Sequence, residues 1–217
     1  NDPPVLSDIS PVTFNEDESI LLDLSASDVD EDVLTFGISE GTNIFASLTD
    51  SQVSFTSSLD FNGTEYFTVT TTDGQLSDSK SFSVTVLPVN DAPIAYASES
   101  STDEDQNVVI VLMGTDIDSN NLLYTVAVVP ESGDVSIEGS FATYSPYENY
   151  TGTDSFTFNV SDGYLSDEAV VNIAINQVND PPVLSDISPV TFNEDESILL
   201  DLSASDVDED VLTFGIS

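Results

Sequence analysis

Acidic residues recur in this chain at fixed places. An Asp-x-Asp triplet stands at residues 28–30, 116–118 and 206–208, and an Asp-Gly pair at 73–74 and 162–163. Carboxylate oxygens in such groups, with asparagine amides nearby and no histidine or cysteine in the chain, are the ligands that calcium prefers. Magnesium keeps more of its water and requires a stricter octahedron, which makes it the weaker alternative. The chemistry that the sequence favours is therefore calcium binding.

The charge balance of the chain supports a role for external cations. The chain has 41 Asp and Glu residues, one basic residue, Lys80, and a formal net charge of -40. Two carboxylates about 4 Å apart repel each other by about 4 kcal/mol at an effective dielectric constant of about 20. Clustered acids therefore favour bound cations, and a surface of evenly solvated acids is the alternative. Such a charge repels a phosphate backbone, which excludes nucleic acid as a partner.

The acidic stretch from Asp28 to Asp32 is not an EF-hand loop. That loop needs glycine at its sixth position and glutamate at its twelfth, and these positions hold Val33 and Ser39. A calcium site in this chain must therefore be assembled from separate segments.

The chain is built from repeats. An Asn-Asp pair followed closely by proline recurs every 89 residues. The last segment repeats residues 1–39 letter for letter, so the larger period is 178 residues. We expect the chain to be a slice of a longer protein with more repeats. The predicted domains are two complete units, residues 1–89 and 90–178, and the N-terminal part of a third repeat, residues 179–217.

Each unit alternates apolar and polar residues with a period of two, which indicates half-buried β-strands. Ile20, Leu22 and Leu24 alternate with polar residues in the first unit, and similar segments follow at short intervals. Turn residues such as Asn62 and Gly63 separate them, and no segment is typical of a long helix. About seven short strands in a domain of this size predict an all-β fold of tandem Greek-key β-sandwiches arranged end to end.

The predicted sandwich determines where the acids lie. Each acidic group follows an alternating segment or stands in a linker, so it should occupy a loop. Because a sandwich gathers its loops at its two ends, we expect the carboxylates of neighbouring units to meet at their junctions.

Composition excludes several classes of protein. Disulfides are excluded because the chain has no cysteine, and no apolar run approaches the roughly 20 residues of a membrane helix. Nucleophilic triads and thiol chemistry are excluded by the lack of histidine and cysteine, which leaves paired carboxylates, as in glycosidases, as the only catalytic option. Since metal binding explains those carboxylates better, the chain is predicted not to be an enzyme.

Several segments together resemble a cadherin repeat. They are Leu-Ser-Ala-Ser-Asp-Val-Asp at 24–30, Leu-Thr-Phe at 34–36, Tyr-Phe-Thr-Val at 66–69, Val-Thr-Val at 84–86 and Asn-Asp-Ala-Pro at 90–93. More narrowly, the chain resembles the bacterial cadherin-like repeats of very large surface proteins and adhesins, which also carry a late Phe-x-Gly-x-Asp-x-Phe type of segment. The resemblance covers the whole chain and implies Ig-like or cadherin-like β-sandwich domains.

The resemblance implies calcium ions held between successive domains. The first junction would use Glu16, Asn90 and Asp91 with residues of the second unit. The second junction would use Glu104 with the next linker and the Asp-x-Asp triplet after it, and a third set would face a preceding domain. Carried over position by position, the three sets are Glu16, Asn90, Asp91, Asp116, Asp118 and Asp162; Glu104, Asn179, Asp180, Asp206 and Asp208; and Asp28, Asp30 and Asp73.

One loop departs from the animal cadherin pattern. An Asp-x-Glu pair is expected there, whereas the chain has Asp-Phe-Asn at 60–62 and Asn-Tyr-Thr at 149–151. We therefore predict one or two ions per junction in place of three, and weaker binding at the far end of the second unit.

Two functions remain open at this stage. The first is a calcium-stiffened extracellular spacer, stalk or fibre in a bacterial surface adhesin, a class that includes biofilm proteins, with lateral association into filaments left open. The second is an adhesive module that binds like repeats or surface carbohydrate through exposed tyrosines. The tyrosines considered for sugar stacking are Tyr144, Tyr147, Tyr150 and Tyr164.

Overall fold

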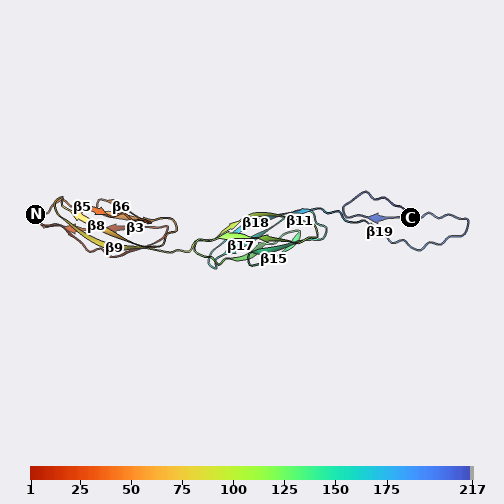
Figure 1. The fold of residues 1–217 in the computed structure, drawn as a ribbon, viewed down its shortest axis with the longest axis horizontal. Coiled ribbons are helices and arrows are strands. Elements are labelled where there is room, and N and C mark those ends of the chain that lie inside the picture. The colour runs from red at the N-terminus through yellow and green to blue at the C-terminus, as the bar shows by residue number, and fades with distance from the viewer. Residues whose placement is uncertain (216–217) are drawn as a thin grey trace. The chain divides into compact units, whose positions relative to one another are not determined.

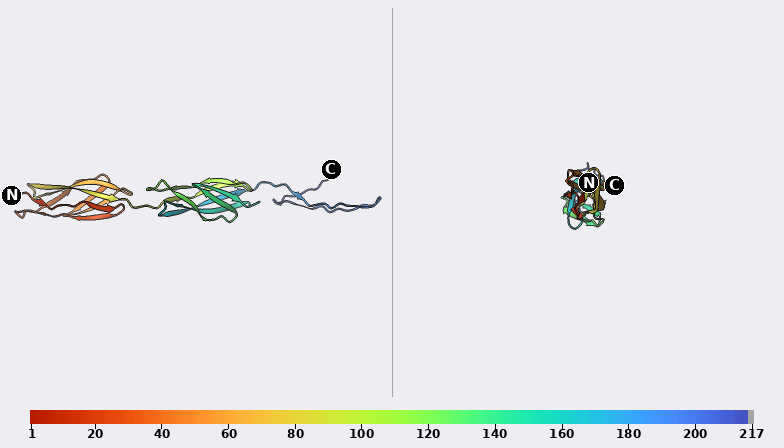
Figure 2. Two further views of the ribbon diagram at one scale, coloured as in Figure 1. Left: turned by 90° about the horizontal axis from the view of Figure 1, so that it is seen from below. Right: turned by 90° about the vertical axis from the view of Figure 1, so that its left-hand side faces the viewer.

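A computed structural model describes residues 1–215 of the chain. It contains two compact units, Asn1–Asp91 and Ala92–Ser217. The described residues form strands, turns and loops and no helix (Figure 1). In each unit the strands run side by side in two facing layers (Figure 2), and the predicted all-β sandwich is confirmed.

The first unit has a four-stranded and a three-stranded sheet. Their strand orders are β2-β9-β8-β5 and β3-β7-β6, and the short strands β1 and β4 form a separate antiparallel pair. Only β2 and β9 pair in parallel within this unit. The strands are β1 (Val5–Leu6), β2 (Val12–Asn15), β3 (Ser19–Asp23), β4 (Ala26–Ser27), β5 (Thr35–Ile38), β6 (Ile44–Thr49), β7 (Gln52–Ser57), β8 (Gly63–Thr72) and β9 (Ser77–Leu87).

Aromatic side chains form the centre of the first core. Phe55 and Phe67 are fully buried and meet edge to face with their ring centroids 5.2 Å apart. Phe82 packs against Phe55 in the same manner at 6.1 Å. Such geometry is favoured by the ring quadrupoles and adds about 0.5–1.5 kcal/mol per pair to the burial of the rings. These contacts join β7 of one sheet to β8 and β9 of the other.

The second unit repeats this plan. Its sheets have the orders β11-β18-β17-β14 and β12-β16-β15, with β10-β13 and β19-β20 as short pairs. The strands are β10 (Ile94–Tyr96), β11 (Ser98–Asp103), β12 (Val108–Val111), β13 (Met113–Thr115), β14 (Leu123–Val128), β15 (Gly133–Glu138), β16 (Phe141–Pro146), β17 (Gly152–Ser161), β18 (Ser166–Asn176), β19 (Val183–Leu184) and β20 (Ala204–Ser205).

The core of the second unit corrects one prediction. Tyr144, considered above as an exposed sugar-stacking residue, is fully buried, and its hydroxyl donates a hydrogen bond of 2.8 Å to Asp154 Oδ2. Tyr144 lies on β16, where alternate residues face the core, and Asp154 supplies the acceptor that a buried phenol needs. Tyr147 and Tyr164 are exposed, at 51% and 88%.

Residues 179–215 of the second unit contain only the β19-β20 pair. The predicted partial repeat therefore retains one short hairpin-like pairing in this segment. Counterparts of β2, β3 and β5 are absent from the described part of this segment.

Candidate calcium sites at the ends of the units

One end of the first unit gathers the Asn1-Asp2 linker, the Asp-x-Asp triplet and the Asp-Gly turn. The backbone nitrogen of Asp2 donates a 2.7 Å hydrogen bond to Asp30 Oδ2, and the nitrogen of Asp30 donates one of 2.8 Å to Asp28 Oδ1. The amide of Asn1 donates to Asp73 Oδ2 at 2.8 Å. Three segments distant in sequence are thereby held together by carboxylates that accept from backbone and amide nitrogens.

The Asp73 side chain is oriented by its own turn between β8 and β9. Its Oδ1 accepts hydrogen bonds from the backbone nitrogens of Leu76 at 2.7 Å and Gln75 at 2.6 Å. These two bonds, with that from Asn1, hold the pKa of the Asp73 carboxyl below its usual value. Asp162 is held in the same way in the second unit, since its Oδ1 accepts from Tyr164 and Leu165 at 2.7 Å.

The opposite set of loops in the first unit carries a buried acid and three clustered ones. Glu16 is only 3% exposed, and its Oε1 accepts a 2.6 Å hydrogen bond from the backbone nitrogen of Val89. Carboxylate oxygens of Asp17, Asp60 and Asp91 lie within 4.8 Å of one another. Opposite oxygens around a calcium ion are separated by about twice the calcium–oxygen distance of about 2.4 Å, so this spacing fits the ion.

The Asn179-Asp180 linker, which lies wholly within the second unit, joins acidic residues from both of its sides. Glu104 is 4% exposed and accepts a 2.6 Å hydrogen bond from the nitrogen of Val178. Oxygens of Glu104, Asp105 and Asp180 lie within 4.8 Å of one another. The nitrogen of Asp180 in turn donates to Asp208 Oδ2 at 2.6 Å. Asp180 therefore connects the acids that precede the linker with those that follow it.

The triplet after this linker has the same internal geometry as the one in the first unit. The nitrogen of Asp208 donates to Asp206 Oδ1 at 3.0 Å, and Asp208 Oδ1 accepts from the side-chain amide of Gln177 at 2.7 Å. The hydrogen bond from the Asp180 nitrogen, followed by that from Gln177, lowers the pKa of the Asp208 carboxyl. An open cavity of about 370 Å³ lies beside it, with Asn149, Asp180 and Asp206 in its lining.

The ligand set predicted for the first junction divides between the two units. Glu16 and Asp91 lie in the loops of the first unit described above, where Asn90 donates its side-chain amide to the carbonyl of Asp91. In the second unit, Asp116 Oδ1 accepts from the nitrogens of Asp118 and Ser119 at 2.8 and 2.7 Å. The assembly of these residues into one site stays a prediction.

Three carboxylate oxygens show that the residues suit a cation. The Oδ2 atoms of Asp28, Asp116 and Asp180 are inaccessible to solvent and accept no hydrogen bond. A desolvated anionic oxygen without a partner is costly, and its cost is offset by a charge of opposite sign. The only basic side chain, Lys80, is engaged with Asp8 on the surface of the first unit. A hard divalent cation is therefore the fitting partner, and Asp28, Asp116 and Asp180 would each help to hold one at a separate place in the chain.

Sequence reasoning overlooked Asp17, Asp32, Asp60 and Asp105, which the structure adds to the clusters. Asp17 and Asp105, the second members of the Glu-Asp pairs, both have positive φ angles, 59° and 58°, and each contributes a carboxylate oxygen to one of the clusters. Asp60 joins Asp17 in the first unit, whereas Asn149 replaces it in the second and donates its backbone nitrogen to Asp105 at 3.0 Å. The repetition of the Glu-Asp pair was the signal that could have identified Asp17 and Asp105.

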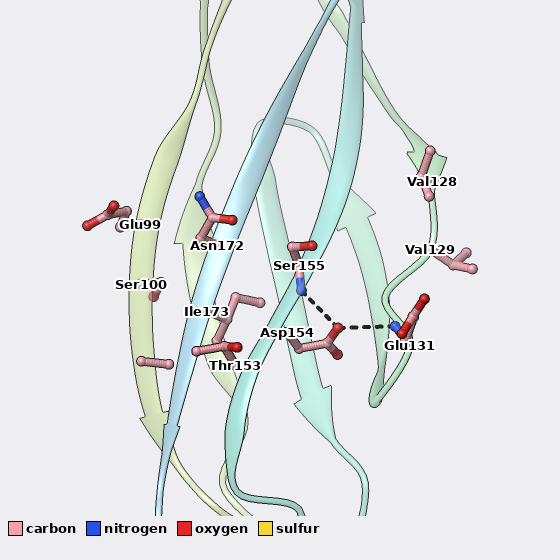
Figure 3. Close-up of a pocket in the computed structure, with 11 residues that line it drawn as sticks. Glu99, Ser100, Val128, Val129, Glu131, Thr153, Asp154, Ser155, Asn172 and Ile173 are labelled. Atoms are coloured by element: carbon pink, nitrogen blue, oxygen red, sulfur yellow. Dashed lines mark hydrogen bonds between the residues drawn. The ribbon is translucent and has the colours of Figure 1, made fainter.

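A cavity of about 710 Å³ in the second unit is a structural feature distinct from these clusters. Asp154 in its lining receives backbone hydrogen bonds from Ser155 and Glu131 (Figure 3). Burial raises the pKa of Asp154, but hydrogen bonds from Tyr144, Ser155, Ser132 and Glu131 outweigh it, so the pKa is lowered. This carboxylate anchors the loop between β14 and β15 and has its acceptor sites filled by protein.

The chain is similar to a known family of bacterial domains. A family model described as "Bacterial Ig domain" matches residues 1–86 and 90–174. The chain therefore belongs to the bacterial Ig domain family and contains two such domains in tandem. Bacterial Ig-like and cadherin-like domains are non-enzymatic modules typical of extracellular proteins.

Solved structures show the same fold. The first two extracellular cadherin domains of human protocadherin-24 match with a TM-score of 0.53 and 18% identity, over 81% of this chain and 99% of that one. An endo-fucoidan hydrolase from glycoside hydrolase family 107 matches with a TM-score of only 0.36, over 29% of its length. The predicted resemblance to bacterial cadherin-like repeats is confirmed by the family and by the cadherin fold.

A curated relative has an adhesion-type name. Integrin beta-like protein A of Dictyostelium discoideum is 27% identical over 212 residues, which are 82% of this chain and 11% of that protein. The chain thus spans about a tenth of the length of this relative. Residues 1–215 include no helix with the length and hydropathy needed to cross a membrane. The family match and the solved structure together describe two tandem bacterial Ig domains with a cadherin-like fold.

Proposed function

We propose that this chain is a calcium-stiffened extracellular spacer of a large bacterial surface adhesin, with ions bound at the junctions between its repeats. The observation that carries the proposal is the position of Asp180. Its Oδ2 is buried without a hydrogen-bond partner, and it lies with Glu104 and Asp105 in one group of carboxylates. The backbone nitrogen of Asp180 also donates a hydrogen bond to Asp208 Oδ2 in the following repeat.

This arrangement links repeat geometry to cation binding. Without a cation, the carboxylates of Glu104, Asp105 and Asp180 repel one another in a chain that has almost no basic side chains. A cation that binds only the ordered junction stabilises it by about 2.7 kcal/mol at a hundredfold excess over its dissociation constant. The junction then resists bending, which suits a repeated unit that serves as a spacer and sets the length of the protein.

Scattering and melting of the 217-residue chain test the proposal. We expect calcium in excess to raise the melting temperature and to increase the maximum dimension measured by small-angle X-ray scattering, relative to chelator. Magnesium and sodium at matched ionic strength are the controls for general screening. Equal responses to all three salts would show that the acids are only a solvated surface and would refute the proposal.

A variant locates the effect. Asp180→Asn keeps the size of the side chain but removes the charge of the residue shared by both halves of the junction. We expect a reduced number of bound ions by isothermal titration calorimetry. Asp201→Asn, an exposed site outside the clusters, is the matched control and should bind as the parent does. An unchanged number of bound ions in Asp180→Asn would show that Asp180 is not a ligand and that the ions bind elsewhere.

An adhesive role for the repeats is the second candidate. Tyr164, at the turn between β17 and β18, is 88% exposed and offers an aromatic face to a sugar or a like chain. A glycan array and sedimentation of the calcium-loaded chain, each compared with Tyr164→Ser, test this role. No glycan bound and no self-association in the parent chain would exclude it.

A further inference from the structure

Asn62 and Gly63 form the only Asn-Gly pair in the chain. In such a pair the backbone nitrogen of the glycine can attack the side-chain carbonyl carbon of the asparagine, because no Cβ on the following residue obstructs the approach. The reaction occurs without an enzyme and converts the amide to a carboxylate. Its rate in a folded protein depends on how firmly the two residues are held.

The Asn62 side chain is not held. It is exposed, and within the described residues it takes part in no hydrogen bond, ion pair or ring contact. It stands in the loop between β7 and β8, where the nitrogen of Phe61 closes a turn to the carbonyl of Ser58 at 3.2 Å. The side chain is therefore at liberty to rotate toward the nitrogen of Gly63.

The two Asp-Gly pairs of the chain, which can undergo the same ring closure, are protected by contrast. The nitrogen of Gly74 donates a 3.0 Å hydrogen bond to Thr72 Oγ1, and that of Gly163 donates one of 3.0 Å to Ser161 Oγ. The carboxylates of Asp73 and Asp162 are each held by two backbone nitrogens. Gly63 itself begins β8 and pairs with Val86, so the difference lies in the attacked side chain: those of Asp73 and Asp162 are held in place and that of Asn62 is not. The two Asp-Gly turns therefore serve as internal controls.

The fold requires the glycine of the reactive pair. Gly63 has a φ of 153°, and a Cβ built on it would lie 2.9 Å from Phe61 Cζ. The equivalent position in the second unit is also a glycine, Gly152, with a φ of 123°, but Thr151 precedes it. The reactive pair therefore arises from a structural glycine combined with an asparagine that only the first unit has.

We propose that Asn62 is a site of spontaneous deamidation. The reaction adds a carboxylate to the end of the first unit that carries Asp17, Asp60 and Asp91. The Gly63 nitrogen forms a bond to Asn62 Cγ and loses its proton, and the side-chain nitrogen leaves as ammonia, which gives a five-membered succinimide. One water molecule then opens the ring at either carbonyl and yields aspartate or isoaspartate. No oxidant, reductant or cofactor is required.

The new charge would stand two residues from Asp60, whose carboxylate lies within 4.8 Å of Asp17 and Asp91. The change adds one negative charge to a chain of net charge -40. Its effect on cation binding rests on the proposed function, whereas the reaction itself does not. We expect an aspartate at position 62 to raise calcium affinity at this end several-fold, because it adds one more carboxylate two residues from Asp60.

Peptide mass spectrometry tests the reaction. The folded chain is aged at mildly alkaline pH and digested, and the mass gain from amide to carboxyl is measured at every asparagine. We expect position 62 to convert first and the isoaspartate product to accumulate there. Asn62→Gln should remove this fast phase, because glutamine would close a larger and slower ring.

Two outcomes separate this inference from the calcium proposal. Position 62 could convert faster than the other asparagines in a urea-unfolded sample but no faster than them in the folded chain. The fold would then protect it, and the inference is overturned. If it converts rapidly while Asn62→Asp leaves calcium binding unchanged, the modification stands and its effect on cation binding is refuted. Failure of calcium binding in the parent chain would leave the ageing result unaffected.

Discussion

Residues 1–37 and 179–215 have the same sequence and different structures. Leu6 and Phe14 are 1% and 6% exposed in the first segment, whereas their counterparts Leu184 and Phe192 are 54% and 57% exposed. The short pair β1-β4 reappears as β19-β20 with equivalent residues opposite each other. Strands β2, β3 and β5 have no counterpart in the second segment. The comparison separates what a sequence does locally from what it does only against partners.

The partners are the strands that follow residue 40. In the first unit β2 pairs with β9, β3 with β7 and β5 with β8. Residues 179–215 have no such strands beside them, so the same alternating pattern remains unpaired. Backbone groups of a lone strand are satisfied by water, and its apolar face stays exposed, so nothing offsets the entropy of ordering it.

Some of the proposed ligands are arranged alike in the two segments and others are not. The linker and triplet make the same hydrogen bond in both segments, at 2.7 Å from Asp2 to Asp30 and at 2.6 Å from Asp180 to Asp208. Glu16 is buried at the end of a sandwich, while its counterpart Glu194 is exposed. The triplet half of a site therefore forms locally, and the glutamate half requires a complete core.

The largest expected effect comes from supplying the missing partners. Joining a second copy of residues 40–91 after Ser217 should convert residues 179–215 into a sandwich with buried Leu184 and Phe192. Amide hydrogen exchange by mass spectrometry should then show strong protection in this segment. A scrambled 40–91 sequence of the same composition is the control. Continued rapid exchange with the correct sequence would show that partner strands are not what distinguishes the two segments.

The reverse change should make the first unit resemble the unpartnered segment. Phe55→Ala removes a fully buried ring at the contact between the two sheets and should cost about 3–5 kcal/mol of unfolding free energy. Phe45→Ala on β6, where the side chain is 49% exposed, is the matched control and should change stability by less than about 1 kcal/mol. Urea unfolding measures both. Similar losses would contradict the assignment of the core.

Exchanging the residues at positions 60 and 149 should reverse the difference in cation affinity between the corresponding ends of the two units. Asp60→Asn gives the first unit the amide that Asn149 has in the second, and we expect cation affinity at that end to fall about tenfold, or about 1.4 kcal/mol. Asn149→Asp should produce the opposite change beside Asp105 and Asp180. Calcium titration calorimetry measures both variants. Affinities that move together, or not at all, would show that this position is not a ligand.

A smaller effect on the stability of the fold is expected when the pH is lowered. The pKa of Asp154 is lowered in the folded state, so its carboxylate stabilises the fold above the unfolded pKa near 3.8, and this contribution is lost as pH falls through the folded pKa. Asp154→Asn should therefore reduce stability at neutral pH and flatten the decline in acid. Thermal melts from neutral to acid pH without calcium measure it. Parallel curves for the parent and the variant would contradict this role.

Much of the fold could be predicted from the chain alone. Alternation identified the segments that became β3, β7, β8 and β9, because half-buried strands require that pattern. It did not identify β11, whose residues Ser98–Asp103 are all polar, since this strand is defined by parallel pairing with β18. Tyr144 was likewise misjudged, because an aromatic residue in an alternating segment does not reveal which face is buried.

The sequence by itself determined the repeat spacing, the β-sandwich pattern, the acidic triplets and the linker, because these depend on neighbouring residues and on composition. Only the tertiary structure decided that Glu16 and Glu104 are buried, and that Asp17 and Asp60 join one cluster. It also decided that one copy of an identical segment joins two sheets while the other forms only the β19-β20 pair. The physical reason is the same in each case. Burial and strand pairing depend on residues far away in the chain, and a segment acquires them only where those residues are folded beside it.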